Sequence, residues 1–333
     1  MSKSKKNAVL YPDSKNGIYL YECPMINGIK QYVQVRGADR KNPLILFLHG
    51  GPGGSLAGLC HVLQAGWEDK FTVANWDQRN ACKTYFANKE KAKKIAKTGT
   101  MEDFIKDIDE VISYLHTVYD FEKLILMGFS WGSAIGSEYA KHHPENLLCY
   151  IGVGQHISYV DGLHFVCDKL SKLAKGDEKD LSKIKAFEAS IPTEPKMTKE
   201  FMANLRIYIA LGTKYISKSG KPFPLKALLT SPFLNFKEKI SMFKSDFTLL
   251  EGTLSTMMTY DFRENLSYKV PVLFISGEED FSCPTGMLDD CFDSISAPVK
   301  KFAIIPKSAH TCFFDQPVIF QQKVSEFMNG IHL

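Results

Sequence analysis

The segment KLILMGFSWGSAIGSEY, residues 123–139, is the most informative stretch of the chain. It starts with an apolar run of strand length, continues through Gly128-Phe129-Ser130-Trp131-Gly132, and then shows small and apolar residues at helical spacing. A strand, a G-x-S-x-G turn and a helix are the context of a nucleophile elbow. Glycines at 128 and 132 are expected because the strand and helix backbones pass closely beneath a strained turn. The alternative is an ordinary strand-helix connection that happens to contain a serine.

The composition bounds the class of protein. The chain has 333 residues, of which 44% are hydrophobic and 23% charged, as in an ordinary globular protein. A net charge of +4 suggests no nucleic-acid surface, and no apolar run is long enough for a membrane helix. The basic start, MSKSKKNAV, lacks the apolar stretch of a secretory signal. Eight cysteines without a C-x-x-C pair predict buried free thiols and a cytoplasmic location.

Alternating strand and helix patterns predict a mostly parallel sheet with helices on both faces. An amphipathic helix is expected over 101–119, with Thr100 as its N-cap. Shorter helices are expected at 286–292 and 316–330, the latter with Val318, Phe320, Val324 and Phe327 facing inward. The first two strands should form a hairpin around residues 26–28. The expected strands are 18–23, 29–36, 44–48, 71–76, 123–127, 147–153, 270–276 and 301–305.

The pattern changes between residues 155 and 265, where no convincing strand is found. Helical stretches follow one another there, with lysines on their polar faces and frequent aromatic residues. We expect an all-helical cap at 155–265, inserted into an α/β core formed by residues 1–154 and 266–333. The expected cap helices are 157–174, 179–190, 198–216 and 246–261.

Three polar residues follow the ends of predicted strands in the order Ser130, Asp280 and His310. Open α/β sheets bind their ligands at those ends. Only His49 and His310 of the nine histidines follow an apolar strand, and His49 lies in a glycine-rich loop, so His310 is the natural base. Two neighbouring carboxylates compete with Asp280 for the role of the acid, namely Glu278 and Glu279.

These motifs resemble the proline iminopeptidase-like serine hydrolases of the α/β-hydrolase superfamily. The resemblance covers nearly the whole core and rests on HGGPGG (49–54), WDQR (76–79), GFSWGS (128–133), GEEDFSCP (277–284) and SAH (308–310). It implies an α/β-hydrolase fold and a catalytic triad in which Ser130 is the nucleophile, His310 the base and Asp280 its partner. It also implies an oxyanion hole formed by the N–H groups of Gly51 and Trp131.

The resemblance implies further properties of the site. Family members use no metal and no cofactor, and their caps select the substrate. The match to the family's D-Q-R at Asp77–Arg79 is interpreted as shaping the pocket floor. Gly50 and Glu251 are the residues that we expect to contact the substrate. The expected partner is a small peptide, or a small acyl or aminoacyl compound, with neither nucleic acid nor membrane involved.

The sequence departs from the family where substrate is selected. Members that cleave N-terminal proline hold the free amine with cap glutamates, but the comparable stretch here, residues 255–262, contains none. Asn80-Ala81-Cys82 replaces the usual G-x-G, and Ala309 replaces the glycine before the histidine. The leading interpretation is an aminopeptidase acting on short peptides. The alternatives are an ester, amide or lactone hydrolase with the same triad, and a binding protein that has lost catalysis.

An aminopeptidase needs an acidic anchor, because desolvating a cationic amine without a partner is costly. Glu251 is our preferred anchor, since Leu249, Leu250 and Leu254 place it beside an apolar stripe. The alternative for each candidate is a solvated helix face. The candidates in the predicted cap are Glu188, Glu200, Asp246, Glu251 and Asp261.

Overall fold

A computed structural model describes residues 9–10, 12, 14–243 and 246–331, so nearly all of the basic N-terminus lies outside the described residues. An eight-stranded sheet forms its centre, in the order β1-β4-β6-β5-β7-β8-β9-β10. A separate two-stranded ribbon pairs β2 with β3. The strands are β1 (Ile18–Glu22), β2 (Met25–Ile26), β3 (Ile29–Lys30), β4 (Val33–Gly37), β5 (Leu44–Leu48), β6 (Thr72–Trp76), β7 (Leu124–Phe129), β8 (Leu147–Val153), β9 (Val272–Gly277) and β10 (Lys300–Ile305).

The sheet is mostly parallel, which confirms the predicted fold class. Strands β6, β5, β7, β8, β9 and β10 pair in parallel, whereas β1 and β4 add an antiparallel edge. Every residue of β5 and β7 is buried, as expected for central strands covered on both faces. Burial on both faces explains why these two strands are continuous apolar runs in the sequence.

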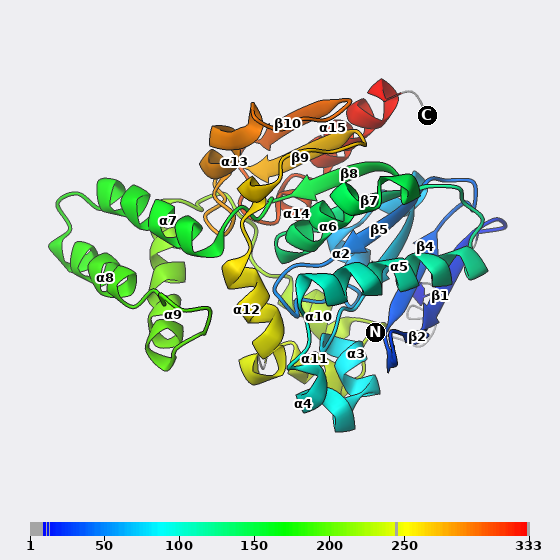
Figure 1. The fold of residues 1–333 in the computed structure, drawn as a ribbon, viewed down its shortest axis with the longest axis horizontal. Coiled ribbons are helices and arrows are strands. Elements are labelled where there is room, and N and C mark those ends of the chain that lie inside the picture. Colours follow the sequence, from blue (N-terminus) through cyan, green and yellow to red (C-terminus); the bar gives the residue numbers. More distant parts are fainter. Residues whose placement is uncertain (1–8, 11, 13, 244–245, 332–333) are drawn as a thin grey trace.

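Helices cover both faces of the sheet (Figure 1). Leu44, Leu46 and Leu48 of β5 pack into the cluster that contains α5 and α6, while Ile45 and Phe47 pack into the cluster that contains α14 and α15. This alternation follows from the period of two in a strand. The helices are α2 (Cys60–Leu63), α3 (Cys82–Ala87), α4 (Ala92–Ile95), α5 (Met101–Val118), α6 (Trp131–His142), α7 (Tyr159–Leu173), α8 (Glu178–Ala189), α9 (Lys199–Tyr215), α10 (Leu225–Thr230), α11 (Phe236–Ser241), α12 (Glu251–Thr259), α13 (Thr285–Phe292), α14 (Cys312–Asp315) and α15 (Pro317–Gly330), with short 3₁₀ turns η1 (Trp67–Asp69), η2 (Lys89–Lys91), η3 (Pro144–Asn146), η4 (Phe247–Leu250) and η5 (Phe262–Glu264).

Two local predictions need correction. The predicted strand 29–36 is divided into β3 and β4, because the turn at Asn27 and Gly28, both with positive φ, closes the small β2–β3 ribbon. The longer pairing to β1 is made by β4 alone. Val318 does not face inward and is 78% exposed, whereas Phe320, Val324 and Phe327 are buried. Val318 precedes Phe320 by two residues, which is about 200° of rotation around the helix, so its side chain lies on the opposite side of α15.

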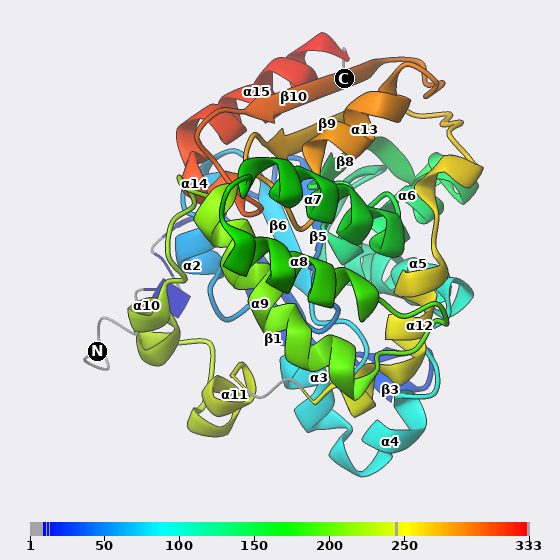
Figure 2. The ribbon, with the colours of Figure 1, turned by 90° about the vertical axis from the view of Figure 1, so that its left-hand side faces the viewer.

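The segment between β8 and β9 forms helices α7 to α12. Its two ends lie side by side, since Ser158 and Asp261 form an isolated antiparallel bridge and the Phe262 N–H donates to Ile157 O over 2.8 Å. Figure 2 shows α7, α8 and α9 in front of the sheet, beyond the carboxyl end of β8. The division into a core (1–154 and 266–333) and a helical cap (155–265) remains a prediction. No helix in the described part of the chain is both long and apolar enough to cross a membrane.

Candidate active site

The G-x-S-x-G segment forms a tight turn between β7 and α6. Ser130 has φ 55° and ψ −123°, a strained conformation for a residue other than glycine, and its N–H donates to Val153 O over 2.9 Å. A Cβ at Gly128 would lie 2.4 Å from Gly132 O, and one at Gly132 would lie 2.1 Å from Leu48 O. Both glycines are therefore required by backbone contacts, as the sequence predicts, and the turn presents Ser130 at the end of the strand.

Asp280 and His310 follow the neighbouring strands β9 and β10 and meet directly. Asp280 Oδ2 lies 2.8 Å from His310 Nδ1, and the Asp280 side chain is fully buried. Asp280 Oδ1 accepts hydrogen bonds from the N–H groups of Ser282 (2.8 Å) and Cys283 (2.9 Å). Because an ionised carboxylate only accepts hydrogen bonds, His310 donates through Nδ1 and keeps Nε2 for another partner.

The rival carboxylates point to other partners. Glu279 accepts from the N–H (2.6 Å) and the hydroxyl (2.7 Å) of Ser219, and Glu278 accepts from the Lys307 N–H (3.0 Å). Neither is recorded in contact with the imidazole. Among the three acids of this run, the structure brings only Asp280 to His310.

The three sequence-predicted residues converge around the turn after β8. A Cβ added to Gly154 would lie 3.2 Å from Asp280 Oδ2 and 3.3 Å from His310 Nδ1. The ring of Phe129, directly before Ser130, lies 4.8 Å from the His310 ring. In the described part of the chain no hydrogen bond joins Ser130 to His310. Catalytic hydrogen bonds of this kind are often long without substrate and tighten in the complex.

Cys283 is the residue of the site that our sequence reasoning missed. Its Sγ lies 3.9 Å from Ser130 Oγ, although the two residues are 153 positions apart. Burial raises the pKa of the Cys283 thiol well above its usual range, so this neighbour is a neutral thiol. The only sequence signal was its place in the GEEDFSCP motif, three residues after Asp280.

The glycine loop after β5 lies against Ser130. A Cβ at Gly50 would approach Ser130 Cβ to 2.7 Å, so only glycine allows this contact. Among the described residues, the N–H groups of Gly51 and Trp131 donate no hydrogen bond to the rest of the chain. Both belong to segments that adjoin Ser130, as an oxyanion hole requires.

His49 fixes this loop to the D-Q-R segment. The Gln78 N–H donates to His49 Nε2 (3.1 Å) and the Gln78 side chain donates to His49 O (2.8 Å), so His49 Nδ1 carries the proton and donates to Gly50 O (2.8 Å). Burial lowers the pKa of His49 to about 4, which keeps the ring neutral near pH 7. His49 therefore positions the loop and is not a second catalytic base.

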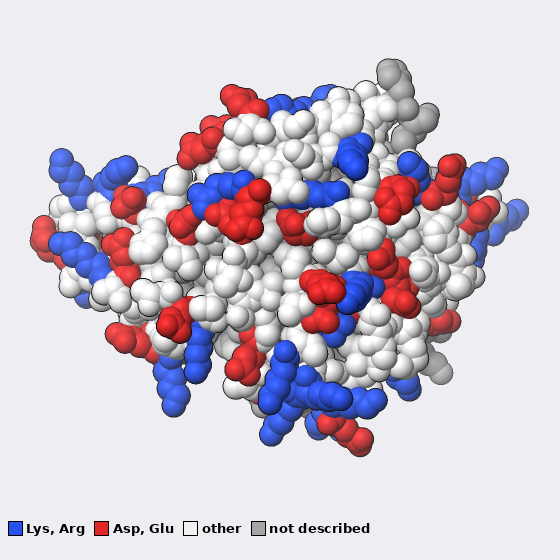
Figure 3. Space-filling view, in the orientation of Figure 1, with Lys and Arg blue, Asp and Glu red and all other residues white. Residues whose placement is uncertain are grey.

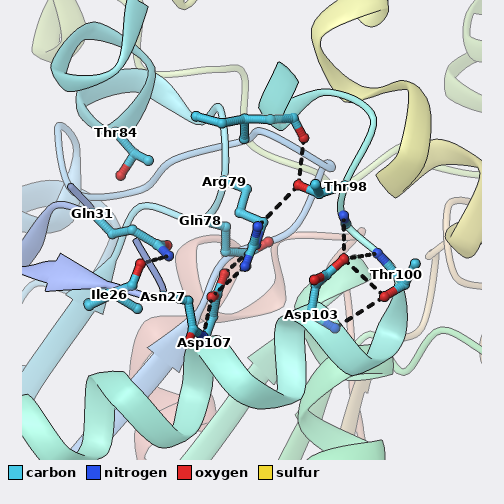
Figure 4. Close-up of polar contacts among 12 residues, drawn as sticks. Ile26, Asn27, Gln31, Gln78, Arg79, Thr84, Thr98, Thr100, Asp103 and Asp107 are labelled. Carbon is cyan, nitrogen blue, oxygen red and sulfur yellow. Dashed lines mark hydrogen bonds and ion pairs between the residues drawn. The ribbon is translucent and has the colours of Figure 1, made fainter. Parts of the chain in front are cut away.

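The other two members of the D-Q-R segment tie the same region together. Asp77 accepts hydrogen bonds from the Ser55 hydroxyl and from the Lys83 N–H (3.0 Å). Burial raises the pKa of Asp77 to about 6. Arg79 forms a bidentate ion pair with the buried Asp107 of α5, with Nη2 and Oδ1 separated by 2.7 Å (Figure 4). None of the three D-Q-R residues is among the described residues that line the adjacent cavity, so their role in shaping the pocket floor remains a prediction.

The departure from the family's G-x-G has a structural consequence. Asn80 and Cys82 adopt φ values of 55° and 24°, which glycine would adopt without strain. Asn80 uses its side chain to donate to Leu249 O (2.7 Å) and Ala92 O (3.0 Å). The substituted residue thus connects the core loop to the helical segment, a link that glycine could not make.

A cavity of about 670 Å³ opens beside the glycine loop. Gly51, Pro52, Gly53 and Gly54 form one end of it. Its other walls come from α3, η2, α7, α9, α11, η4 and α12 and the residues next to them, so the helical segment supplies most of the lining. The volume is that of a site for a small ligand.

The cap carboxylates do not gather at this cavity. Glu251, our preferred anchor, is exposed and is not among the lining residues, and Glu188 pairs with His164 over 3.3 Å. Glu200 is exposed in the first turn of α9, and Asp261 is held by Arg263. Of the five candidates only Asp246 lines the cavity. The substrate role of Glu251 remains a prediction that the cavity lining does not support.

The fold and the elbow define the class of the protein. Residues 43–317 match the family model described as the alpha/beta hydrolase fold, and the chain belongs to this family. The resemblance seen in the motifs is confirmed by a relative from Bacillus subtilis (strain 168), named a probable aminopeptidase, YbaC. It is 26% identical over 318 residues, covering 95% of this chain and 98% of the relative.

Solved structures share the fold at lower sequence identity. A proline iminopeptidase from Mycobacterium smegmatis superposes with a TM-score of 0.66 at 17% identity, covering 94% of this chain and 98% of that one. An esterase from Exiguobacterium antarcticum gives a TM-score of 0.59 at 16% identity, covering 94% of this chain and 100% of that one. Peptidases and esterases thus share this architecture.

Proposed function

We propose that the protein is a serine hydrolase in which Ser130 is the nucleophile, His310 the general base and Asp280 the group that orients the imidazole. The observation that carries the proposal is the 2.8 Å contact between Asp280 Oδ2 and His310 Nδ1, beside a serine held on a strained turn. A serine hydroxyl is a weak nucleophile until an adjacent base removes its proton. His310 Nε2 is the atom available for that step.

The reaction proceeds through an acyl-enzyme. Ser130 Oγ bonds to the substrate carbonyl carbon while its proton passes to His310, and the N–H groups of Gly51 and Trp131 stabilise the oxyanion. His310 then protonates the leaving group as its bond to carbon breaks. A water molecule, deprotonated by His310, releases the acid and restores Ser130. Asp280 stays ionised and stabilises the imidazolium.

The relatives suggest that the substrate is a small peptide or an aminoacyl amide, from which the enzyme would release the N-terminal residue. This is the proline iminopeptidase-like candidate, and the probable aminopeptidase of B. subtilis is its main support. The helical segment over the carboxyl end of β8 would act as the lid that selects chain ends.

The second candidate is hydrolysis of esters or amides whose acyl part has no free amine. The cavity favours it, because the only carboxylate among its described lining residues is the exposed Asp246. The five side chains that could have bound an amine are solvated or already paired, as described above.

A panel of aminoacyl arylamides and acyl esters, each tested with wild type and Ser130→Ala, separates these candidates. Turnover of arylamides with free amines, abolished in Ser130→Ala, supports the aminopeptidase. Turnover restricted to acyl esters, abolished in the same variant, supports the second candidate. Equal turnover by wild type and variant would reject the serine mechanism altogether.

We also propose that the protein works in a reducing compartment such as the cytoplasm. All eight cysteines are free thiols, and six of them are buried. Disulfides are common in oxidising compartments and rare in reducing ones.

A further inference from the structure

The cavity beside the glycine loop has walls that no catalytic step uses. Four of the eleven methionines of the chain line it, namely Met197, Met202, Met242 and Met257. Leucines from α9, η4 and α12 complete the apolar surface, among them Leu205, Leu250 and Leu254. Flexible methionine side chains adapt to ligands of different shape. Such a surface suits an apolar group that varies in length or branching.

The cavity offers a cationic ligand no buried anion, because its three described charged lining residues are all exposed to solvent. Among its described lining residues, Lys89 and Lys237 are cations and Asp246 is the single anion. Asp246 already accepts from the N–H (3.1 Å) and the hydroxyl (2.6 Å) of Thr248, where it caps η4. Figure 3 shows basic side chains gathered at the edge of the molecule near α4.

The cavity adjoins the reacting centre through the glycine loop. Gly51 and Gly53 line the cavity, and their neighbour Gly50 lies against Ser130, which is not itself among the lining residues. An acyl carbon attached to Ser130 Oγ would therefore place the next atoms of its chain beside the glycine loop, at the entrance to the apolar walls. A protonated amine on the first of these atoms would lose water without gaining a buried carboxylate.

We propose that this cavity binds the acyl part of the substrate, and that this part is an apolar group without positive charge, such as a medium-length or branched fatty acyl chain. The inference rests on the proposed serine hydrolysis and selects its second candidate. The reaction is the one given above: the acyl carbon bonds to Ser130 Oγ, the leaving alcohol takes the proton from His310, and water releases the carboxylic acid.

The first experiment compares two substrates that differ only in the amine. Leucine ethyl ester and 4-methylpentanoic acid ethyl ester share the same carbon skeleton, and their hydrolysis can be followed in a pH-stat. The kcat/KM of each ester is divided by the rate constant for alkaline hydrolysis of the same ester, because the amine makes leucine ethyl ester more reactive even without an enzyme. We expect the amine-free ester to be preferred by at least about tenfold, since the free amine has no buried partner. A tenfold preference for leucine ethyl ester would overturn the inference.

The second experiment tests the cavity itself. A buried methylene adds about fourfold to binding, so the hexanoyl ester of p-nitrophenol should exceed the acetyl ester by at least about tenfold in kcat/KM. Leu205→Trp narrows the cavity and should abolish this advantage, so that the ratio of kcat/KM for the hexanoyl ester to kcat/KM for the acetyl ester falls to about one. Ile209→Trp is the matched control, because Ile209 lies on the same helix, is exposed and does not line the cavity.

Labelling by a small alkyl fluorophosphonate distinguishes failure of this inference from failure of the proposed function. If Ser130 is labelled but acyl length and Leu205→Trp have no effect, the acyl subsite is rejected and the serine mechanism stands. The same conclusion follows if none of these esters is turned over while labelling persists. If labelling persists in Ser130→Ala, the proposed function itself fails.

Discussion

Acid should destabilise the protein through His49, and His49→Gln should remove this part of the effect. In the folded protein His49 Nε2 accepts the Gln78 N–H, and burial lowers the His49 pKa to about 4. A glutamine at this position keeps an acceptor for Gln78 but cannot take up a proton near neutral pH. The variant therefore isolates the titration of one buried ring.

The magnitude follows from the two pKa values of His49. Its pKa falls from 6.5 to about 4 on folding. The unfolded chain thus binds more protons between these values, and stability falls as pH decreases through this range. The full difference is worth about 3 kcal/mol, of which about 2 kcal/mol is lost between pH 7.5 and pH 5.0. Above pH 6.5 His49 makes nearly its full contribution to the free energy of unfolding.

The assay is urea unfolding at pH 7.5 and pH 5.0. Wild type should lose about 2 kcal/mol more than His49→Gln over this interval. Burial also lowers the pKa of His156 to about 4 and raises that of Asp77 to about 6, but both groups are present in both proteins and cancel in the comparison. His164→Gln, which removes an exposed histidine on α7, should behave as wild type. Equal losses in wild type and His49→Gln would refute the reasoning.

Three further substitutions test the site and its support. Asp280→Asn should lower kcat by about 10⁴ because the imidazole takes the wrong tautomer, whereas Glu279→Gln should stay active; the reverse outcome would exchange their roles. Arg79→Met should destabilise by about 3–5 kcal/mol in urea by leaving Asp107 buried and unpaired, and adding Asp107→Leu should restore most of the loss. Gly50→Ala should lower kcat by about 10²–10³. The added methyl group would lie 2.7 Å from Ser130 Cβ and would displace the loop that carries an oxyanion donor. An unchanged kcat would contradict the placement of this loop against Ser130.

The sequence predicts those features that local pattern controls. Strands β5 and β7 are continuous apolar runs because they are buried on both faces, and the glycines around Ser130 are dictated by backbone contacts within one supersecondary unit. The order of the strands then places Asp280 and His310 at the same edge of the sheet. This is why the residues of the candidate triad could be named before any geometry was known.

Features that depend on long-range packing could not be predicted in this way. Cys283 lies beside Ser130 because β7 and β9 end at the same edge of the sheet, and its place in the GEEDFSCP motif is the only signal of the contact in the sequence. The described lining of the cavity comes from the glycine loop and from seven helices or 3₁₀ turns, so its shortage of carboxylates cannot be seen in any one helix. Glu251 illustrates this limit, because the neighbouring leucines are buried or half-buried while its own side chain is exposed; its role in substrate binding remains a prediction.

The sequence pattern does not predict the short helices α10 and α11, for a different reason. Helices α10 and α11 have six residues each, too few for an apolar period to emerge. The signal for α11 was nevertheless present, because Asn235 and Glu238 form a capping box that the sequence displays as N-x-x-E. The capping pattern therefore indicates this helix where apolar periodicity does not.

The most direct test of the account is the site of covalent labelling by a fluorophosphonate, identified by mass spectrometry of the digested protein. We expect a single modified serine, Ser130, with labelling lost and kcat lowered by about 10⁶ in Ser130→Ala. Ser282→Ala, which removes a neighbouring hydroxyl but keeps the N–H that binds Asp280, should label and turn over as wild type. Modification of a different residue, or equal labelling of wild type and Ser130→Ala, would contradict the assignment of Ser130 as the nucleophile.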